Sequence, residues 1–363
     1  SRVSGDTAVT LLDGATGRVR AGRNGEAEFV ASVDTATAHR RVVVRQVPST
    51  LTTADSLRLI ALGQTPQLAV SVRDRRGNDV ANSPPVWTSL DLGVCTVNAG
   101  GLVTATSNGT CRVEGRVATL ADTTRVVVAQ VARALRRVSG DGQSAQVGTA
   151  LTAPFAVEVL DSLGAVVRRA GELVRFAVTG GGGSLAGQDA LDVASDANGG
   201  ASATLTLPTA AGPQTVSARL LSLVSGTVAF SATAVPAPAL TLTPVSGNNQ
   251  SGIVGASLAA PFAVVVQDTF GNAVPGREVW FKVTRGGGKL GGQDSVVVGT
   301  NALGQASATL SLGTAPDTNL VTATSAGLVG SPATFVAVAA AGPVGTLSLV
   351  SGGDQSGLVG AVL

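Results

Sequence analysis

The sequence contains few of the side chains on which catalysis and metal binding depend. Tyr and Met are absent, His occurs once, Cys and Trp twice each, and Phe accounts for 8 of 363 residues. General acid and base catalysis draws mainly on His, Tyr, Cys and clustered carboxylates, so we expect no enzyme. One His and two Cys also fall short of the ligand set of a usual zinc site. We therefore expect no metal and no cofactor.

Charge is scarce as well. Charged residues make up 13 % of the chain and the formal net charge is +2, whereas soluble proteins usually have about 25 % charged residues. Lys occurs only at Lys282 and Lys289, and the Arg residues form no run. This excludes the dense basic face that nucleic-acid binding requires. No stretch of this segment approaches the ~18 apolar residues of a membrane span. Hydrophobic residues still reach 44 %, which supports packed cores and excludes a disordered chain.

Glycine, in contrast, is abundant and marks an internal repeat. Val138–Ser144 (VSGDGQS) recurs as Val245–Ser251 (VSGNNQS) and as Val350–Ser356 (VSGGDQS). Between these markers Ala153–Val157 (APFAV) corresponds to Ala260–Val264 (APFAV). A repeat of this size predicts tandem structural units. We place two complete units at 132–238 and 239–344, and the first strand of a further unit at 345–363.

The front of the chain contains a second type of repeat. The segment Val94–Val128 has an earlier copy in Ala8–Val44, with Gly101–Ala105 matching Gly17–Ala21. We therefore interpret residues 47–131 as one complete domain and residues 1–46 as the back half of another.

Within each unit the hydrophobic pattern has a period of two, between turns rich in Gly, Asn, Asp and Pro. Phe155–Val159, Val174–Val178 and Ala201–Leu207 each alternate in this way, so each predicts a strand with one buried face. About seven such runs per repeat are typical of an antiparallel two-sheet sandwich of immunoglobulin type. No segment has a helical stripe with caps. We predict an all-β chain of tandem Ig-like sandwiches arranged as an elongated rod.

Short motifs in both repeat types resemble bacterial immunoglobulin-like families. Residues 47–131 are similar to the group 2 bacterial Ig-like domain through Leu62–Thr65, Val72–Asn78, Val86–Ser89 and Gly101–Ala105. The two later units resemble the invasin and intimin type, or group 1, through Asp268–Asn272, Val279–Val283 and Gly304–Ala308. The resemblance implies a secreted or cell-surface bacterial protein, in which such domains serve as stalks, adhesin arms or fibre subunits. It covers nearly the whole chain.

Cys95 and Cys111 fall in strands that the earlier copy places at Ala8 and Ala27. Two Ala at these positions imply a closely packed buried pair, and a disulfide between sheets or adjacent strands fits that space. In an oxidising compartment we predict this bond. The alternative is two free buried thiols.

Two further motifs have a structural and a functional interpretation. Asp74, Asp161 and Asp268 each precede a tight turn, where Asp caps the turn with its side chain; calcium-stiffened linkers are the alternative. Gly286–Gly291 matches the spacing of the dinucleotide fingerprint. That fingerprint requires a following helix, whereas the next segment reads as a strand, so we interpret the glycines as a connection between sheets.

Trp280 is the most informative single residue. Alternation places Val279, Phe281 and Val283 inward and Trp280 outward, where the preceding unit has Arg175. An outward Trp in so aromatic-poor a chain suggests an interface with a neighbouring subunit or domain. The alternative is an indole that lies over its own sheet. We interpret Trp87 as a structural core residue and His39 as a solvated strand residue.

Two functions fit these observations. In the first, the sandwiches stack into an extracellular filament or cell-surface stalk, because low charge favours packing of copies. In the second, they form the arm of a bacterial adhesin whose binding tip lies outside this segment.

The expected partners are copies of the chain, neighbouring repeats and host or neighbouring cell surfaces. The incomplete units leave sheet edges that strands of other copies could complete; the alternative is that only part of a longer polypeptide is present. Sugar recognition by these domains is disfavoured, because aromatic platforms are few.

Overall fold

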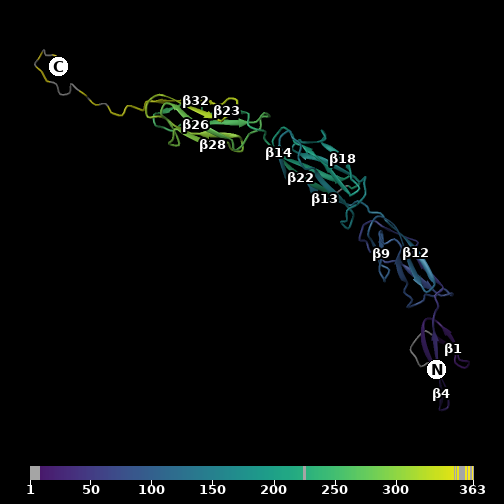
Figure 1. The fold of residues 1–363 in the computed structure, drawn as a ribbon. Coiled ribbons are helices and arrows are strands. Elements are labelled where there is room, and N and C mark those ends of the chain that lie inside the picture. Colours follow the sequence, from purple (N-terminus) through teal and green to yellow (C-terminus); the bar gives the residue numbers. More distant parts are fainter. Residues whose placement is uncertain are drawn as a thin grey trace.

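The computed structural model arranges the chain as a gently curved line of successive β-units, with the first described strands toward one end and the last described strands toward the other (Figure 1). It describes residues 9–223 and 226–346, together with 348, 350, 356, 357, 359 and 362. All regular elements in the described residues are β-strands. The predicted all-β fold class is therefore confirmed. Most of the predicted strand within 345–363 lies outside the described residues.

From residue 9 to residue 131, the described front of the chain contains twelve strands. In the first 46 residues they are β1 (Val9–Asp13), β2 (Arg18–Ala21), β3 (Gly25–Val33) and β4 (Ala36–Val44). In residues 47–131 they are β5 (Thr50–Thr53), β6 (Ser56–Leu59), β7 (Val70–Arg73), β8 (Val86–Ser89), β9 (Cys95–Val97), β10 (Val103–Ala105), β11 (Gly109–Val117) and β12 (Leu120–Val128).

Each of the two later units contains ten strands. The first set is β13 (Ala134–Ser139), β14 (Gln143–Gln146), β15 (Phe155–Leu160), β16 (Leu173–Gly180), β17 (Ser184–Leu185), β18 (Ala190–Ala194), β19 (Gly200–Ala203), β20 (Leu205–Thr206), β21 (Gly212–Leu220) and β22 (Thr227–Val235). The second is β23 (Thr241–Ser246), β24 (Gln250–Ile253), β25 (Phe262–Gln267), β26 (Glu278–Arg285), β27 (Lys289–Leu290), β28 (Ser295–Gly299), β29 (Gln305–Ala308), β30 (Leu310–Ser311), β31 (Thr318–Thr324) and β32 (Ala333–Ala340).

The two later units have the same sheet topology. A three-stranded sheet, β13-β15-β19 or β23-β25-β29, faces a five-stranded sheet, β14-β22-β21-β16-β18 or β24-β32-β31-β26-β28. The first two strands of each unit join different sheets. The first, β13 or β23, belongs to the three-stranded sheet, and the second, β14 or β24, pairs in parallel with the last strand of the unit, β22 or β32. In residues 47–131, β6 pairs in parallel with β12 in the same way. The sandwich expected from the sequence is therefore present, but its boundaries along the chain remain a prediction.

The repeated VSG-x-x-QS motif lies where the first strand passes from one sheet to the other. Gly247 has φ of +88°, and a Cβ there would lie 2.1 Å from the carbonyl oxygen of Pro261. Gln250 spans the same gap, because its Nε2 donates to Ala260 O at 2.8 Å and its Oε1 accepts from Ala260 N at 3.0 Å. In the preceding unit Gln143 makes the equivalent bonds to Ala153. The motif and the repeated APFAV segment therefore recur together because they are in contact.

Replacing Gly247 with Ala is expected to lower the free energy of unfolding by about 2 kcal/mol, through left-handed backbone strain and a clash with backbone. Urea unfolding would measure the loss. Gly255→Ala is the matched control, since Gly255 has φ of +73° but has nothing within 4 Å of an added Cβ. Equal losses in the two variants would contradict a role for the contact with Pro261.

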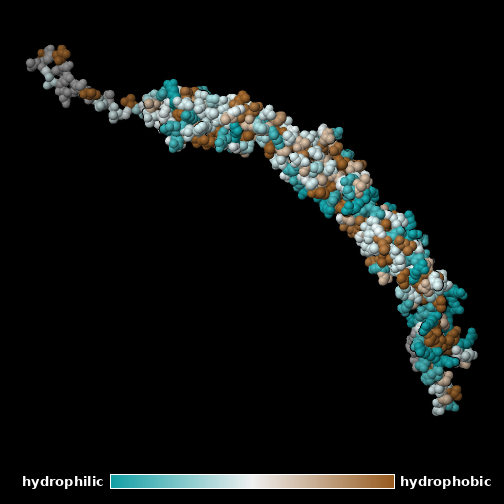
Figure 2. Space-filling model, viewed as in Figure 1, coloured by the Kyte–Doolittle hydropathy of each residue, from teal (hydrophilic) through white to brown (hydrophobic). Residues whose placement is uncertain are grey.

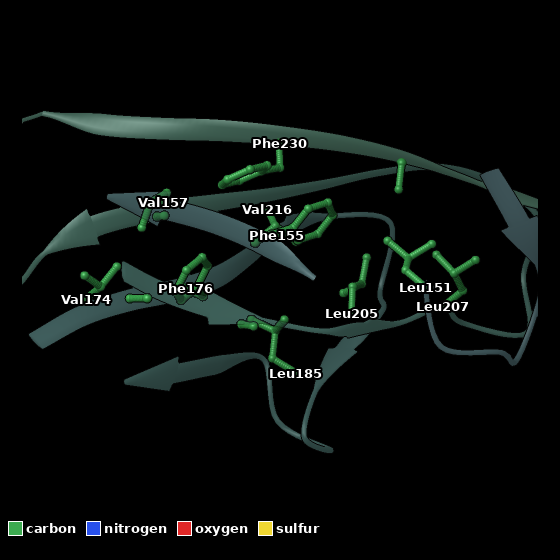
Figure 3. Packing of buried hydrophobic residues seen from close by; sticks show 14 of the residues in the cluster. Leu151, Phe155, Val157, Val174, Phe176, Leu185, Leu205, Leu207, Val216 and Phe230 are labelled. Carbon is green, nitrogen blue, oxygen red and sulfur yellow. The ribbon is translucent and has the colours of Figure 1, made fainter. Parts of the chain in front are cut away.

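Each later core lies between the two sheets and is built from alternating strand residues. Figure 3 shows Phe155 and Phe230 projecting from opposite sheets toward the same interior, with ring centroids 4.7 Å apart. Phe262 and Phe335 repeat this stack at 4.8 Å. The alternating run 201–207 is divided: β19 pairs with β15, whereas β20 pairs with β17. The single strand expected there is therefore wrong, although its inward side chains remain buried.

Strands β1 to β4 pair in the same registers as strands β9 to β12 of the following segment. Val9 faces Ala21 as Cys95 faces Ala105, and Ala27 faces Val42 as Cys111 faces Val126. The residue equivalent to Cys95 is therefore Val9 and not Ala8, which lies outside the described residues. Val9 and Ala27 are both buried. In the part of the chain that the structure describes, β3 and β4 pair only with each other.

Candidate functional site: the junctions between units

The junctions are short segments that are hydrogen-bonded on both sides. They span residues 45–49, 129–133 and 236–240, between the last strand of one unit and the first of the next. At the middle junction Val131 N donates to Ile60 O at 2.9 Å, and Arg133 N donates to Leu160 O at 2.7 Å. The linker backbone is therefore bonded to both of the units that it joins.

A buried Asp closes the middle junction. Asp161, which follows β15, is 2 % exposed. Its Oδ1 accepts hydrogen bonds from the N–H groups of Leu163 and Ala165, both at 3.0 Å, within its own turn. Its Oδ2 accepts from Leu62 N at 2.9 Å and from Gln130 Nε2 at 2.8 Å. One oxygen therefore holds the turn, and the other holds the preceding unit.

Asp268 occupies the same position at the next junction and is 3 % exposed. Its Oδ1 accepts from the N–H groups of Phe270 and Asn272, both at 2.8 Å. Its Oδ2 accepts from Ala237 N in the linker at 2.8 Å. Oδ2 also accepts from Asn272 Nδ2 of its own turn at 2.8 Å, so this oxygen, unlike Oδ2 of Asp161, bonds to both the turn and the linker.

Asn272 extends this contact into the preceding unit. Its Nδ2 donates to Thr209 O at 2.8 Å, and its Oδ1 accepts from Ala211 N at 2.8 Å. Both partners lie in the turn between β20 and β21. The DTFGN segment that the sequence singled out therefore binds two separate parts of the chain before it.

The first junction uses the same residue types with a looser geometry. Gln46, the equivalent of Gln130, donates from Nε2 to Asp74 Oδ2 and to Asp79 O, both at 3.2 Å. Asp74 Oδ1 holds its own turn through Arg76 N at 2.8 Å. The side chain and N–H of Asn78 are the main causes that lower the pKa of Asp74 to about 2. At all three junctions of the described chain, Oδ2 of an Asp therefore accepts a hydrogen bond from a linker residue, which is Gln46, Gln130 or Ala237.

Hydrogen bonding keeps the junction carboxylates ionised. Burial by itself would raise the pKa of Asp161, but the bonds from Gln130, Leu62 and its own turn outweigh it, so that the pKa is lowered from 3.8. For Asp268 burial is again opposed by Asn272, Ala237 and the turn, and the net pKa is also lowered. Every one of these partners donates a hydrogen bond to the carboxylate, which favours its charged form.

We expect the junctions to resist mild acid. Because the folded-state pKa of Asp161 and Asp268 lies below 3.8, the two carboxylates contribute their full stability above about pH 5. That contribution falls as the pH drops through the lowered folded-state values. Thermal unfolding and small-angle X-ray scattering between pH 7 and pH 2 would measure it. Loss of the extended shape near pH 6 would contradict this assignment.

The predicted disulfide is present in residues 47–131. Cys95 and Cys111 are joined, with their Cα atoms 6.1 Å apart, and both are fully buried. Cys95 lies in the β9–β10 sheet and Cys111 in the four-stranded sheet. Of the two arrangements that the sequence left open, the bond therefore links two sheets.

The remaining residues singled out in the sequence lie apart from the junctions. Trp280 is 58 % exposed on β26, and contact with a neighbour remains a prediction. Trp87 packs partly buried against the core of its unit, and a Cβ at Gly115 would lie 2.9 Å from its ring. His39 is exposed on β4, with Nδ1 3.0 Å from Glu28 Oε1. The segment after Gly286–Gly291 is β28, as expected from the sequence.

The surface of the curved chain is mixed in hydropathy along its length. Hydrophilic and hydrophobic patches alternate over the visible face, and the hydrophilic ones are densest over the first unit (Figure 2). None of the described residues forms a helix that could cross a membrane.

Comparison with known proteins shows similarity only at the level of structure. No protein-family model matches the chain, and no curated protein matches it. The Escherichia coli adhesin FdeC is 18 % identical over 80 % of this chain and 99 % of that chain, with a TM-score of 0.40. Invasin, a bacterial integrin-binding protein, is 17 % identical over 81 % of this chain and 60 % of that chain, with a TM-score of 0.46. Domains 1–6 of the surface layer protein SbsC are 14 % identical over 89 % of this chain and 46 % of that chain, with a TM-score of 0.31. At these identities each likeness concerns the fold alone.

Proposed function

We propose that this chain is a non-catalytic structural segment of an extracellular or cell-surface bacterial protein. Its sandwiches would form a stiff rod that serves as a filament or as a stalk. The observation that carries this proposal is the construction of the junctions. Asp161 and Asp268 are buried, and Oδ2 of each accepts a hydrogen bond from the chain before its own turn. Such contacts hold consecutive units in a fixed orientation, which a rod requires and an independently folding domain does not.

The shape of the chain in solution tests this proposal. We expect small-angle X-ray scattering to show an elongated particle of constant cross-section, and negative-stain electron microscopy to show gently curved rods. Particles with randomly bent junctions, or a compact particle, would contradict it.

Electron microscopy of the native material would separate the two roles that a rod can serve. Uniform fibres indicate a filament, whereas single arms projecting from cells indicate an adhesin arm or stalk. The outer edge of β4, which pairs with β3 alone among the strands of the described residues, supports strand addition from another copy. Sedimentation of the chain tests this point, because a monomer at every concentration would contradict strand addition.

A further inference from the structure

The outer face of the five-stranded sheet differs between the two later units at one position. In the earlier unit Arg175 forms a paired hydrogen bond with Asp192, with Nε to Oδ1 and Nη2 to Oδ2 both at 2.7 Å. In the later unit the same place is taken by Trp280, which faces Val297 in register. Trp280 is 58 % exposed and Val297 is 52 % exposed. Because an ion pair fills the equivalent place in the preceding unit, this sandwich fold does not require an indole at this position.

The exposed indole forms one wall of a surface hollow of about 670 Å³, within the range of roughly 300–1,000 Å³ for small-ligand sites. The rest of the lining comes from the start of β26, from β28 and from the end of β31. These residues are Gly276, Arg277, Glu278, Val297, Thr324, Ser325 and Ala326.

Arg277 is held in place at the edge of this hollow. Its Nε donates to Ser325 Oγ at 2.9 Å and its Nη2 to Ala326 O at 2.5 Å. Ser325 Oγ in turn donates to Glu278 O at 2.8 Å. A guanidinium has five N–H donors, so donors remain for a ligand while the side chain is already oriented. Such preorganisation lowers the entropy cost of binding.

The polar groups of the hollow select against ions. The Arg277 guanidinium disfavours a cationic ligand, and the Glu278 carboxylate disfavours an anionic one. Together they offer donors next to acceptors, which suits adjacent hydroxyl groups. The flat apolar face of Trp280 lies beside them and suits a ring that presents C–H groups.

From these residues we propose that the hollow binds a neutral sugar unit of a polysaccharide. The ring stacks on Trp280, and its hydroxyls bond to Arg277 and Glu278. The scarcity of aromatic residues disfavours sugar recognition at the level of the sequence, whereas the exposed Trp280 beside Arg277 and Glu278 supports a single site of this kind. The proposal does not depend on the rod function, since the hollow lies within one unit.

Affinity electrophoresis tests the proposal with defined probes. We expect migration of the chain to be retarded in gels that contain at least one of four soluble neutral polysaccharides: dextran, yeast mannan, galactomannan or hydroxyethyl cellulose. Intrinsic fluorescence gives a second measurement, because the chain has two Trp and no Tyr. Oligosaccharides of the retarding polymer should shift the Trp280 emission to shorter wavelength.

The chain itself provides the matched control. Trp280→Arg with Val297→Asp installs the pair found in the preceding unit, so the variant is expected to fold with an unchanged circular dichroism spectrum. Its affinity for the retarding polysaccharide should fall roughly tenfold or more, as for loss of an aromatic anchor. Its remaining fluorescence comes from Trp87 alone and should not respond.

Three outcomes would overturn the proposal. The first is the absence of retardation by all four polysaccharides. The second is equal retardation of the parent chain and the Trp280→Arg, Val297→Asp variant. The third is a variant whose only change is reduced self-association in sedimentation experiments, because the hollow would then be a contact between copies of the chain.

Discussion

Replacing Cys95 with Val and Cys111 with Ala is expected to destabilise residues 47–131 by about 3 kcal/mol, because the bond closes a loop with a sequence separation of 16. The two replacements are those found at the equivalent buried positions Val9 and Ala27. They fill the space with residues that this fold already accepts. The loss therefore reports the bond rather than a cavity. Calorimetry should show one transition shifted down by roughly 10 °C or more, with the transitions of the later units unchanged.

Reduction of the parent chain provides the control for this prediction. Dithiothreitol should lower the same transition in the parent chain and leave the double variant unaffected. A variant that melts with the parent would show that the small core, and not the covalent bond, stabilises this unit. The core contains nine buried apolar residues, the two Cys among them, so we expect the bond to matter.

The sequence allowed the fold to be predicted wherever one strand face is buried. Val279 and Phe281 are buried while Trp280 is exposed, as a period of two requires. The repeats located the units because the VSG-x-x-QS motif and the APFAV segment are in direct contact. The division of residues 201–207 between two sheets could not be predicted, since burial continues to alternate through Thr204 and only the choice of pairing partner changes.

The junctions could be predicted only in part. The turn-capping role of Asp161 and Asp268 followed from the local sequence, because each Oδ1 bonds to N–H groups two and four residues later. The second oxygen binds Leu62 or Ala237, which lie 99 and 31 residues before it. No local pattern contains that information. One signal was present, since Gln46 and Gln130 occupy the same place in both copies of the front repeat.

The double variant Asp161→Asn, Asp268→Asn is expected to lose the fixed orientation between consecutive units, so that the units move independently. Asn keeps the shape of Asp and one acceptor oxygen, but its amide group would face the donors that now bind Oδ2. At Asp161 these donors are Leu62 N and Gln130 Nε2. Leaving buried donors without an acceptor costs about 1–3 kcal/mol each, so we expect a loss of roughly 3 kcal/mol at each junction. If the Asn side chain rotated so that its oxygen faced these donors, its NH₂ group would face the N–H groups of the turn instead, and those donors would lose their acceptor.

Small-angle scattering should show a shorter maximum dimension and a broader range of shapes for this variant, while circular dichroism stays unchanged. Asp196→Asn is the matched control. Asp196 caps a turn with bonds from Asn198 N and Gly200 N, and the equivalent turn of the next unit already has Asn301. The control removes one of the two negative charges that the double variant loses, without touching a junction, so we expect the parent shape. If Asp196→Asn bent the chain as much as the double variant, net charge rather than the junction bonds would hold the units in line. If neither variant changed the scattering, packing between the units would suffice, and the buried carboxylates would serve only their own turns.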